Sequence, residues 1–427
     1  MATIEWVNHA SFVLDHCGTR LICDPWLDGP AFDQGWDLVS RTVFSYEAFR
    51  NITHVWFSHE HPDHFSPPTL AKIPSDARAN ITAYYQATRD QRVIHFCRQK
   101  GFANTSELYP GQWQSVGRDF SVLCEPHDNG DSWLAARIGD LMVLNLNDCV
   151  VTTAAECKRI GRKLGRIDIL ATQFSYANWV GNKDNVAAMR QAASEKLAWM
   201  KTQIVSLSPK FVLPFASFVF FSHEDNCSLN QGMTTADEAV EFVKKETCAI
   251  PVVLYPGDRW ALESSPPDQE AIRRLYTADY DATRRDTIRH RSESRPWPEL
   301  LEHGNEFTDR LRNRNGILLR CLPTVHVFVE DHARALRLSG RGVVEDDRTR
   351  ASCDLACKSD ALDHAFRFDW GGRTLDINGR FQVPSGGGYW KFKTYATLAN
   401  FNSRDEGLFT IVRTAWQRAK KRLVLRT

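Results

Sequence analysis

The sequence predicts an α/β protein in which layered sheets are flanked by helices, followed by a smaller α+β domain. Three observations support this fold class. Short apolar runs typical of strands are interleaved with helical patterns over roughly the first 260 residues. Charged residues and prolines then become dense between residues 262 and 320. Strand-like patterns return after residue 320, which indicates a second folding unit.

Residues 1–262 are interpreted as the catalytic domain. IEWVNHASFVLDHCGTRLICD predicts two or three short strands that end at Asp24, and HVWFS predicts a short apolar strand. SPPTLAKI, which follows, predicts a helix that Ser66 caps and that has proline just inside its start. LMVLNLND, ILATQFS and KFVLPFASFVFF predict further strands, and TTADEAVEFVKK predicts a capped helix.

The remainder is divided into a connector and a C-terminal domain. Residues 263–319 are expected to form a charged connector with solvated helices, and residues 320–427 an α+β domain that resembles a sterol-carrier domain. TVHVFVED, HAFRFDW, RTLDING and YWKFKTYATL are expected to be strands of this domain. AWQRAKKRLVLRT, at the end, predicts a basic amphipathic helix with a solvated face.

Composition narrows the functional classes. The chain has 43% hydrophobic residues and a net charge of +1, which favours a packed globular protein and disfavours nucleic acid or an anionic membrane surface as a partner. We find no signal-peptide pattern and no apolar run of about 18 residues, so no transmembrane helix is expected. The 11 cysteines are scattered without a CxxC motif, which indicates a reducing, cytoplasmic location.

The histidine cluster SHEHPDHFS carries the strongest functional signal. His59, His61, Asp63 and His64 lie on a predicted strand-to-helix loop, where His59 and His61 project to the same side. Imidazole and carboxylate ligands suit zinc, iron and manganese, and the lack of cysteine disfavours a closed structural zinc site. The spacing therefore predicts that one loop supplies ligands to two adjacent metal ions.

The other ligands must come from elsewhere in the chain. Asp148 ends the apolar strand LMVLNLND, where a buried carboxylate is costly unless it is paired or binds a metal, so we interpret it as the bridging ligand. His127 is the predicted third ligand of the first metal, and His223 the predicted last ligand of the second. The ordinary alternatives are a turn aspartate and two solvated loop histidines. Asp24, His9 and Asp131 are candidates for orienting the ligands.

HEHPDH at residues 59–64, followed by His127, Asp148 and His223, resembles the ligand set of the metallo-β-lactamase fold. This resemblance implies a four-layer αββα sandwich with the metal site at one edge of the two sheets. HASFVLD, DPWLDGPAFDQGW, NLNDC and LPFASFVFFSHEDN look more specifically like the metallo-β-lactamase portion of the CMP-N-acetylneuraminate hydroxylase family. The closer resemblance covers about 255 residues and supports all seven predicted ligands.

One departure from that family affects the expected chemistry. The hydroxylases carry a Rieske iron–sulfur domain, which needs a CxH and a CxxH spacing together, and this sequence has no CxH spacing to complete such a pair. We therefore expect the electrons to come from a separate ferredoxin-type protein or another reductase, or from the substrate itself.

Two enzymatic hypotheses follow, and the first is narrowly favoured. The resemblance implies a diiron oxygenase that hydroxylates or N-oxidises a small polar substrate, with Asp63 and Asp148 among its catalytic residues. The alternative is a dinuclear zinc or manganese hydrolase of a lactone, ester, amide or phosphodiester, in which Asp63 would orient the attacking water. A binding protein on an inactive fold is a third reading, and a homo-oligomer is left open.

Overall fold

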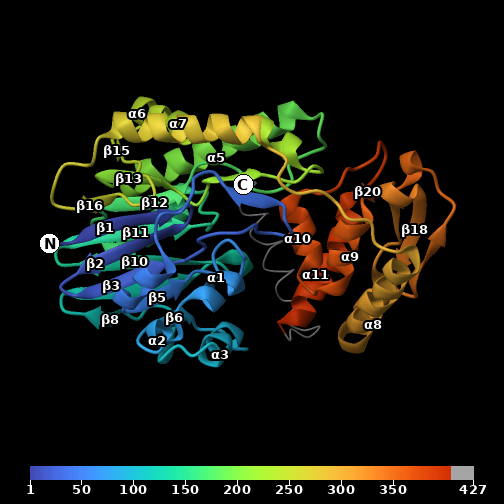
Figure 1. Cartoon of the computed structure of the whole chain (residues 1–427), viewed down its shortest axis with the longest axis horizontal. Coiled ribbons are helices and arrows are strands. Elements are labelled where there is room, and N and C mark those ends of the chain that lie inside the picture. Colours follow the sequence, from blue (N-terminus) through green and yellow to red (C-terminus); the bar gives the residue numbers. More distant parts are fainter. Residues whose placement is uncertain (405–427) are drawn as a thin grey trace.

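Two seven-stranded sheets face each other in the computed structural model, which describes residues 1–404 (Figure 1). The first sheet has the order β16-β1-β2-β3-β5-β6-β7 and the second β15-β13-β12-β11-β10-β9-β8. The first contains Arg259–Ala261 (β16), Thr3–Asn8 (β1), Ser11–His16 (β2), Thr19–Cys23 (β3), His54–Phe57 (β5), Thr82–Gln86 (β6) and Asn104–Leu108 (β7). The second contains Ile250–Pro251 (β15), Phe211–Phe215 (β13), Ile169–Gln173 (β12), Leu141–Asn147 (β11), Ser132–Ile138 (β10), Phe120–Pro126 (β9) and Gln114–Gly117 (β8).

Strand alternation explains why both faces of the first sheet are covered. In β5, Trp56 packs into the core between the sheets, whereas Val55 and Phe57 pack into a second core beneath the helices. This second core lies under Pro67–Lys72 (α1), Ser75–Arg78 (α2) and Arg92–Gln99 (α3). Because successive side chains point to opposite faces, such a strand must be apolar throughout.

Four helices belong to the second sheet: Ala154–Leu164 (α4), Val186–Leu207 (α5), Ala236–Glu246 (α6) and Gln269–Arg285 (α7). The cap predicted for α6 is present, where the side chains of Thr235 and Glu238 form a reciprocal capping box. The layers are therefore helices, sheet, sheet, helices. The predicted four-layer αββα sandwich is confirmed.

The C-terminal part contains a smaller sheet and its own core. Its strands have the order β19-β18-β17-β20 and comprise Gly342–Asp346 (β19), Arg334–Ser339 (β18), Val325–Val329 (β17) and Leu355–Cys357 (β20). Four helices pack with them: Trp297–Cys321 (α8), Ser359–Arg367 (α9), Gly371–Asn378 (α10) and Tyr389–Ser403 (α11). A short pair of strands, Trp36–Leu38 (β4) and Val219–Phe221 (β14), lies outside the main sheets.

Three expected strands of this part are helices, so those predictions were wrong. HAFRFDW falls mostly in α9, RTLDING in α10 and YWKFKTYATL in α11. In α11 the buried residues include Tyr389, Phe392, Tyr395 and Ala396, a spacing of three and four that suits a helix. Gly379, with φ of 67°, ends α10 in the left-handed conformation typical of a helix C-terminus.

Residues 263–319, expected to be a solvated connector, instead contribute to both cores. Ile272 and Tyr276 of α7 are buried in the large core of the sandwich, which includes the helices over the second sheet, and Leu300 and Phe307 of α8 in the C-terminal core. The predicted basic helix at the C-terminus lies outside the described residues. Within residues 1–404, no helix combines the length and apolarity needed to cross a membrane.

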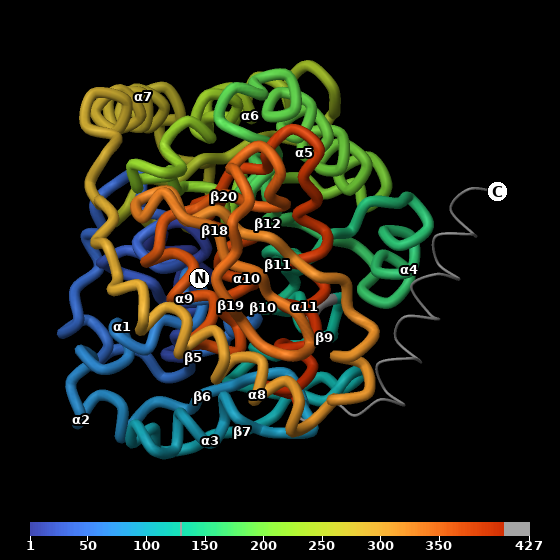
Figure 2. The backbone as a smooth tube through the Cα atoms, turned by 90° about the vertical axis from the view of Figure 1, so that its right-hand side faces the viewer, coloured from blue at the N-terminus to red at the C-terminus, as the bar shows by residue number. Residues whose placement is uncertain are grey.

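The C-terminal part joins the sandwich through buried polar contacts, and α10 lies beside the sandwich in Figure 1 and in front of it in Figure 2. Arg380 is 2% exposed, and its guanidinium donates hydrogen bonds to Asp33 (2.7 Å) and Asp360 (2.5 Å). Asn378 donates to the Phe32 carbonyl at 3.0 Å, and Asn226 donates to the Asn378 carbonyl at 2.7 Å. A buried cation is tolerated only when paired in this way.

Candidate metal centre

The histidine cluster lies where several strands end at one edge of the sandwich. The loop from Ser58 to His64 follows β5, Asp24 follows β3, and Asp148 follows β11. Strands β3 and β5 run parallel, as do β11 and β12, so the carboxyl ends within each pair point the same way. The loops after these strands bring imidazoles and carboxylates from distant parts of the chain together.

Two groups of donor atoms within this cluster have the spacing of metal ligands. One contains His59, His61 and Asp148, and the other contains His9, Asp63 and His64. Within each group, one nitrogen or oxygen atom per residue lies within 4.8 Å of the others. Five of the seven predicted ligands are therefore brought together. His9, which was expected only to orient a ligand, is grouped with two of them.

Asp148 lies between the two groups. Its Oδ2 is 3.8 Å from His59 Nε2, and its Oδ1 is 3.4 Å from His64 Nε2. Gln173, at the end of β12, donates its side-chain amide to Asp148 Oδ1 at 2.8 Å. Lys196 of α5 donates in turn to Gln173 Oε1 at 2.8 Å. The carboxylate thus presents one oxygen to each group and is held in place from behind.

Asp24 fixes the orientation of the ligand loop from below. It is fully buried and accepts hydrogen bonds from the Ser58 amide (2.7 Å), the Ser58 hydroxyl (2.6 Å) and the Asn147 amide group (2.6 Å). Its Oδ2 also lies 3.0 Å from His64 Nδ1. A carboxylate that holds one ring nitrogen of an imidazole leaves the other nitrogen available to a metal. The expectation that Asp24 orients a ligand agrees with this geometry.

The pKa values of the imidazoles diverge because their neighbours differ. Burial lowers the pKa of His59 well below its ordinary value, and the charges of His64 and His61 lower it further. Burial also lowers the pKa of His61 to about 4. For His64, burial acts in the same direction, but the Asp63 and Asp148 carboxylates outweigh it and raise the pKa well above its ordinary value. Two of the three imidazoles are therefore neutral near pH 7, the form that binds metal.

The carboxylates next to His64 shift the other way. Burial raises the pKa of Asp63, but the charge of His64 and hydrogen bonds from His64 and His9 hold it well below its usual value. The pKa of Asp148 is likewise lowered by His64 against the effect of burial. Both carboxylates are therefore ionised near neutral pH, as metal ligands must be.

Asp131 behaves differently from these two ligands. Burial and the nearby charge of Asp148 raise its pKa to about 7, against the opposing charges of His64, Arg373 and Arg404. Its backbone carbonyl accepts a hydrogen bond from the His127 amide at 2.8 Å. A buried carboxylate that resists ionisation is typical of a functional site.

The backbone is strained at the same place. His9, Asp24 and Asn147 have φ angles of 42°, 41° and 50°, in the left-handed region that residues other than glycine rarely adopt. His9 contacts the Asp63 carboxylate, Asp24 contacts the His64 imidazole, and Asn147 donates a hydrogen bond to Asp24. Strain of this kind concentrates at functional sites, where the surrounding contacts hold it.

The last two predicted ligands lie outside the two donor groups. His127 follows β9, and its Nε2 lies 4.0 Å from Glu156 of α4. His223 is fully buried, its Nδ1 accepts from the Asp225 amide at 3.2 Å, and its Nε2 has no hydrogen-bond partner within residues 1–404. Their roles as ligands stay predictions.

The donor set fits two metal ions. Asp63 Oδ1 is buried and has no hydrogen-bond partner in the described chain, whereas His64 Nε2 lies 3.2 Å from Asp63 Oδ2 and 3.4 Å from Asp148 Oδ1. Buried polar atoms are almost always satisfied, so Asp63 Oδ1 implies a missing partner such as a cation. Neutral imidazoles with carboxylates, and no thiolate, suit iron, zinc or manganese.

The fold and this cluster define a metal-binding αββα sandwich. The family model described as the beta-lactamase superfamily domain matches residues 3–216, and the chain belongs to this superfamily. The match covers six of the seven predicted ligands, all except His223. The predicted membership is confirmed.

Relatives and solved structures show what the chain is similar to. It is 26% identical over 290 residues to the cytidine monophosphate-N-acetylneuraminic acid hydroxylase of Macaca mulatta, covering 63% of this chain and 48% of the relative. The chain thus spans about half the length of the curated relatives it matches. CmlA, a diiron beta-hydroxylase from Streptomyces venezuelae, is 18% identical with a TM-score of 0.43, covering 61% of this chain and 53% of CmlA. An isothiocyanate hydrolase from Delia radicum gut bacteria is 15% identical with a TM-score of 0.43, covering 61% and 98%.

Proposed function

We propose that the chain is a dinuclear metal enzyme that activates O₂ and hydroxylates or otherwise oxidises a small polar substrate at a C–H or N–H bond. The observation that carries this proposal is the 26% identity over 290 residues to hydroxylases. The paired donor groups support it because activation of O₂ at two irons requires two adjacent sites built from nitrogen and oxygen ligands.

The candidate ligands are assigned to the two metal ions as follows. His59 and His61 would hold one ion, Asp63 and His64 the other, and Asp148 would bridge them. His127 and His223 are proposed to complete the two ligand shells, and His9 is a further donor next to Asp63. When bound, two irons would supply the redox chemistry, with electrons from a ferredoxin-type protein or another reductase.

The surrounding side chains position these ligands. Asp24 keeps the His64 ring turned so that Nε2 faces Asp148 rather than the protein interior. Gln173 fixes one oxygen of Asp148 through its amide, and Lys196 fixes the orientation of Gln173. Because these contacts are buried or nearly so, the site is preorganised before substrate arrives.

A hydrolase is the second candidate, and the ligand chemistry is equally compatible with it. The donors of the two groups are the kind that zinc and manganese bind as readily as iron. In that case Asp63 would orient the attacking water on a lactone, ester, amide or phosphodiester, and no electron donor would be needed.

Metal analysis of the purified protein tests the choice. The chain would be expressed in iron-supplemented cells, and its metal content and visible spectrum measured together. Two irons per chain, with a spectrum that bleaches on reduction and returns with O₂, would support the oxygenase. Two zincs with no response to reductant or O₂ would contradict it and favour the hydrolase. The Asp148→Ala variant, analysed in parallel, controls for metal bound elsewhere.

A further inference from the structure

A cavity of about 280 Å³ adjoins the candidate metal centre. Glu60, which lies between His59 and His61 in the ligand loop, forms part of its wall, and Arg404 lies where α11 ends. Gln86 ties the wall to the loop, donating to the Ser58 carbonyl at 3.2 Å and to the Gly130 carbonyl at 2.6 Å. The cavity therefore lies between the sandwich and the C-terminal part, next to the loop that carries His59 and His61.

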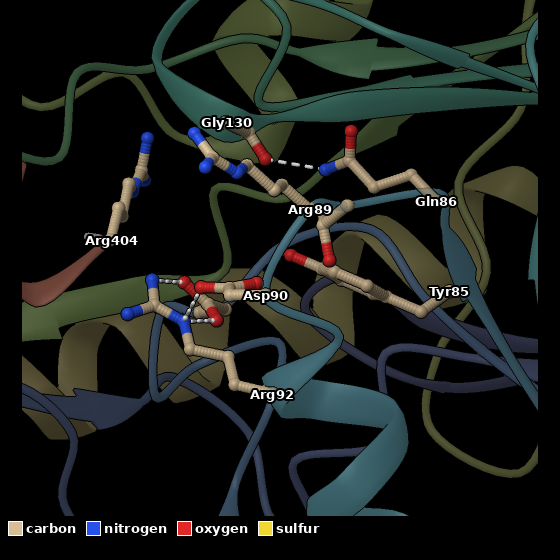
Figure 3. Close-up of a pocket in the computed structure, with 9 residues that line it drawn as sticks. Tyr85, Gln86, Arg89, Asp90, Arg92, Gly130 and Arg404 are labelled. Carbon is tan, nitrogen blue, oxygen red and sulfur yellow. Dashed lines mark hydrogen bonds and ion pairs between the residues drawn. The ribbon is translucent and has the colours of Figure 1, made fainter. Parts of the chain in front are cut away.

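The cavity wall carries three guanidinium groups and two carboxylates. Arg92 forms a two-pronged ion pair with Glu60 and lies 3.4 Å from Asp90, so its charge is compensated. Arg89, by contrast, has neither a hydrogen bond nor an ion pair through its side chain within residues 1–404. It extends toward Gly130 in Figure 3, on the side where Arg404 lies.

Gly130 allows Arg404 to approach the ligand-bearing loops closely. A Cβ atom at Gly130 would lie 2.7 Å from Arg404 Nη2, and φ at this residue is +93°. The positive φ favours glycine here, and a side chain at this position would also push the flexible end of Arg404 away. The guanidinium of Arg404 thus rests against the backbone between His127 and Asp131.

We propose that this cavity binds an anionic group of the substrate, a carboxylate or a phosphate, held by Arg89 and Arg404. A guanidinium offers a planar pair of N–H donors that matches either group. The volume suits an acidic group with a few neighbouring atoms, and it is smaller than a pocket for a whole drug-sized ligand. The rest of the substrate then extends past Glu60 toward the metal centre.

The electrostatic field around the centre agrees with this arrangement. Burial and Asp148 raise the pKa of Asp131, but Arg373 and Arg404 lie close enough for their charges to oppose this, and the charge of Arg373 also reaches His61. Arg373 lies on α10 and Arg404 just beyond α11, so the C-terminal part presents positive charge to the site from two helices. A negatively charged substrate would be attracted to the site along this field.

Anion binding to metal-free protein tests the proposal. Calorimetric titrations at low ionic strength would use inorganic phosphate and, separately, acetate, on the wild type and on the Arg89→Gln and Arg404→Gln variants. We expect each variant to weaken binding about tenfold, because each loses a charge-assisted pair of hydrogen bonds. Tighter binding of phosphate would indicate a phosphate ester, and tighter binding of acetate a carboxylic acid.

The controls separate this proposal from the proposed function, on which its assignment to the substrate rests. Arg118→Gln changes an arginine whose side chain is 85% exposed and should bind both anions as the wild type does. The metal content of the Arg89 and Arg404 variants should equal that of the wild type. Loss of metal in these variants would show that the substitution damaged the metal centre, and would not measure anion binding in the cavity. Wild-type affinity in both variants would overturn the proposal. So would binding that appears only with metal present, since the anion would then occupy the metals.

Discussion

Replacing Asp24 by asparagine isolates the contribution of ligand orientation to metal affinity. Asp24 itself belongs to neither donor group, but its carboxylate accepts from Ser58 and Asn147 and lies 3.0 Å from His64 Nδ1. In Asp24→Asn an amide NH₂ replaces one carboxylate oxygen, so groups of Ser58 or Asn147 that donate to Asp24 would face another hydrogen-bond donor. Asparagine tolerates the φ of 41° at this position, so backbone strain does not confound the result.

The expected effect is a loss of about 10- to 100-fold in metal affinity, the usual result of removing a partner that orients a ligand. This corresponds to roughly 1.4 to 2.7 kcal/mol. The metal-free protein should also lose about 1–3 kcal/mol of stability, because the buried Asn147 amide is left without its acceptor.

The assay is competition between metal-free protein and a chromophoric chelator for zinc, with urea unfolding of the metal-free protein measured alongside. Asp140→Asn is the matched control, since Asp140 is an exposed carboxylate in the hairpin between β10 and β11. Equal zinc affinity in the Asp24 and Asp140 variants would refute the orienting role.

Three further outcomes are expected. Asp148→Ala should abolish activity and lower metal content, measured by mass spectrometry, whereas Cys353→Ser, in a buried thiol of the C-terminal part, should change neither. His223→Ala should lose about one metal ion per chain. If His223→Ala kept its metal stoichiometry while His9→Ala lost a metal ion, the last ligand of the second metal would be His9 and not His223. Asp131→Asn should stabilise the metal-free protein above about pH 7 and have little effect near pH 4. The reason is that the pKa of the Asp131 carboxyl is about 7 in the folded state and 3.8 in the unfolded state, so between these pH values only the folded state holds the proton. The stability of the wild type therefore falls by up to roughly 4 kcal/mol as the pH rises from about 4 to about 7. Thermal melting as a function of pH would measure this loss.

Local sequence was sufficient to single out the histidine loop and Asp148. Four predicted ligands fall within six positions after an apolar strand, and Asp148 ends another strand, so periodicity and residue type placed them at the ends of strands. Layered sheets flanked by helices could be predicted for the same reason, since the strands are short apolar runs with clear ends, whereas the four-layer αββα arrangement followed from the family resemblance. Its helices begin at residues such as Ser66 whose capping role is local.

Tertiary packing decided the rest. His9 lies in the tight turn between β1 and β2, and its contact with Asp63 spans 54 positions, so no spacing rule could assign it to the donor group. Gln173 and Lys196 support Asp148 only because α5 packs on β12. In the C-terminal part, runs such as YWKFKTYATL alternate aromatic and polar residues closely enough to imitate a strand. Burial against α8 and α10 selects the helix instead.

The junction at Arg380 explains why the C-terminal part belongs to the site. Asp33, which accepts from Arg380, is next to Phe32, whose ring centroid lies 5.6 Å from that of His61. Arg380 Nε also lies 3.5 Å from Asp225, whose amide donates to His223. A guanidinium that is 2% exposed holds both segments, and leaving it unpaired in the interior would cost several kcal/mol, so neither segment can move without breaking the junction. The edge-to-face contact of the Phe32 ring with His61 and the position of His223 are therefore both set by a residue far beyond the family match. By this argument, removal of the C-terminal part would disorder the metal centre as well as the proposed anion cavity.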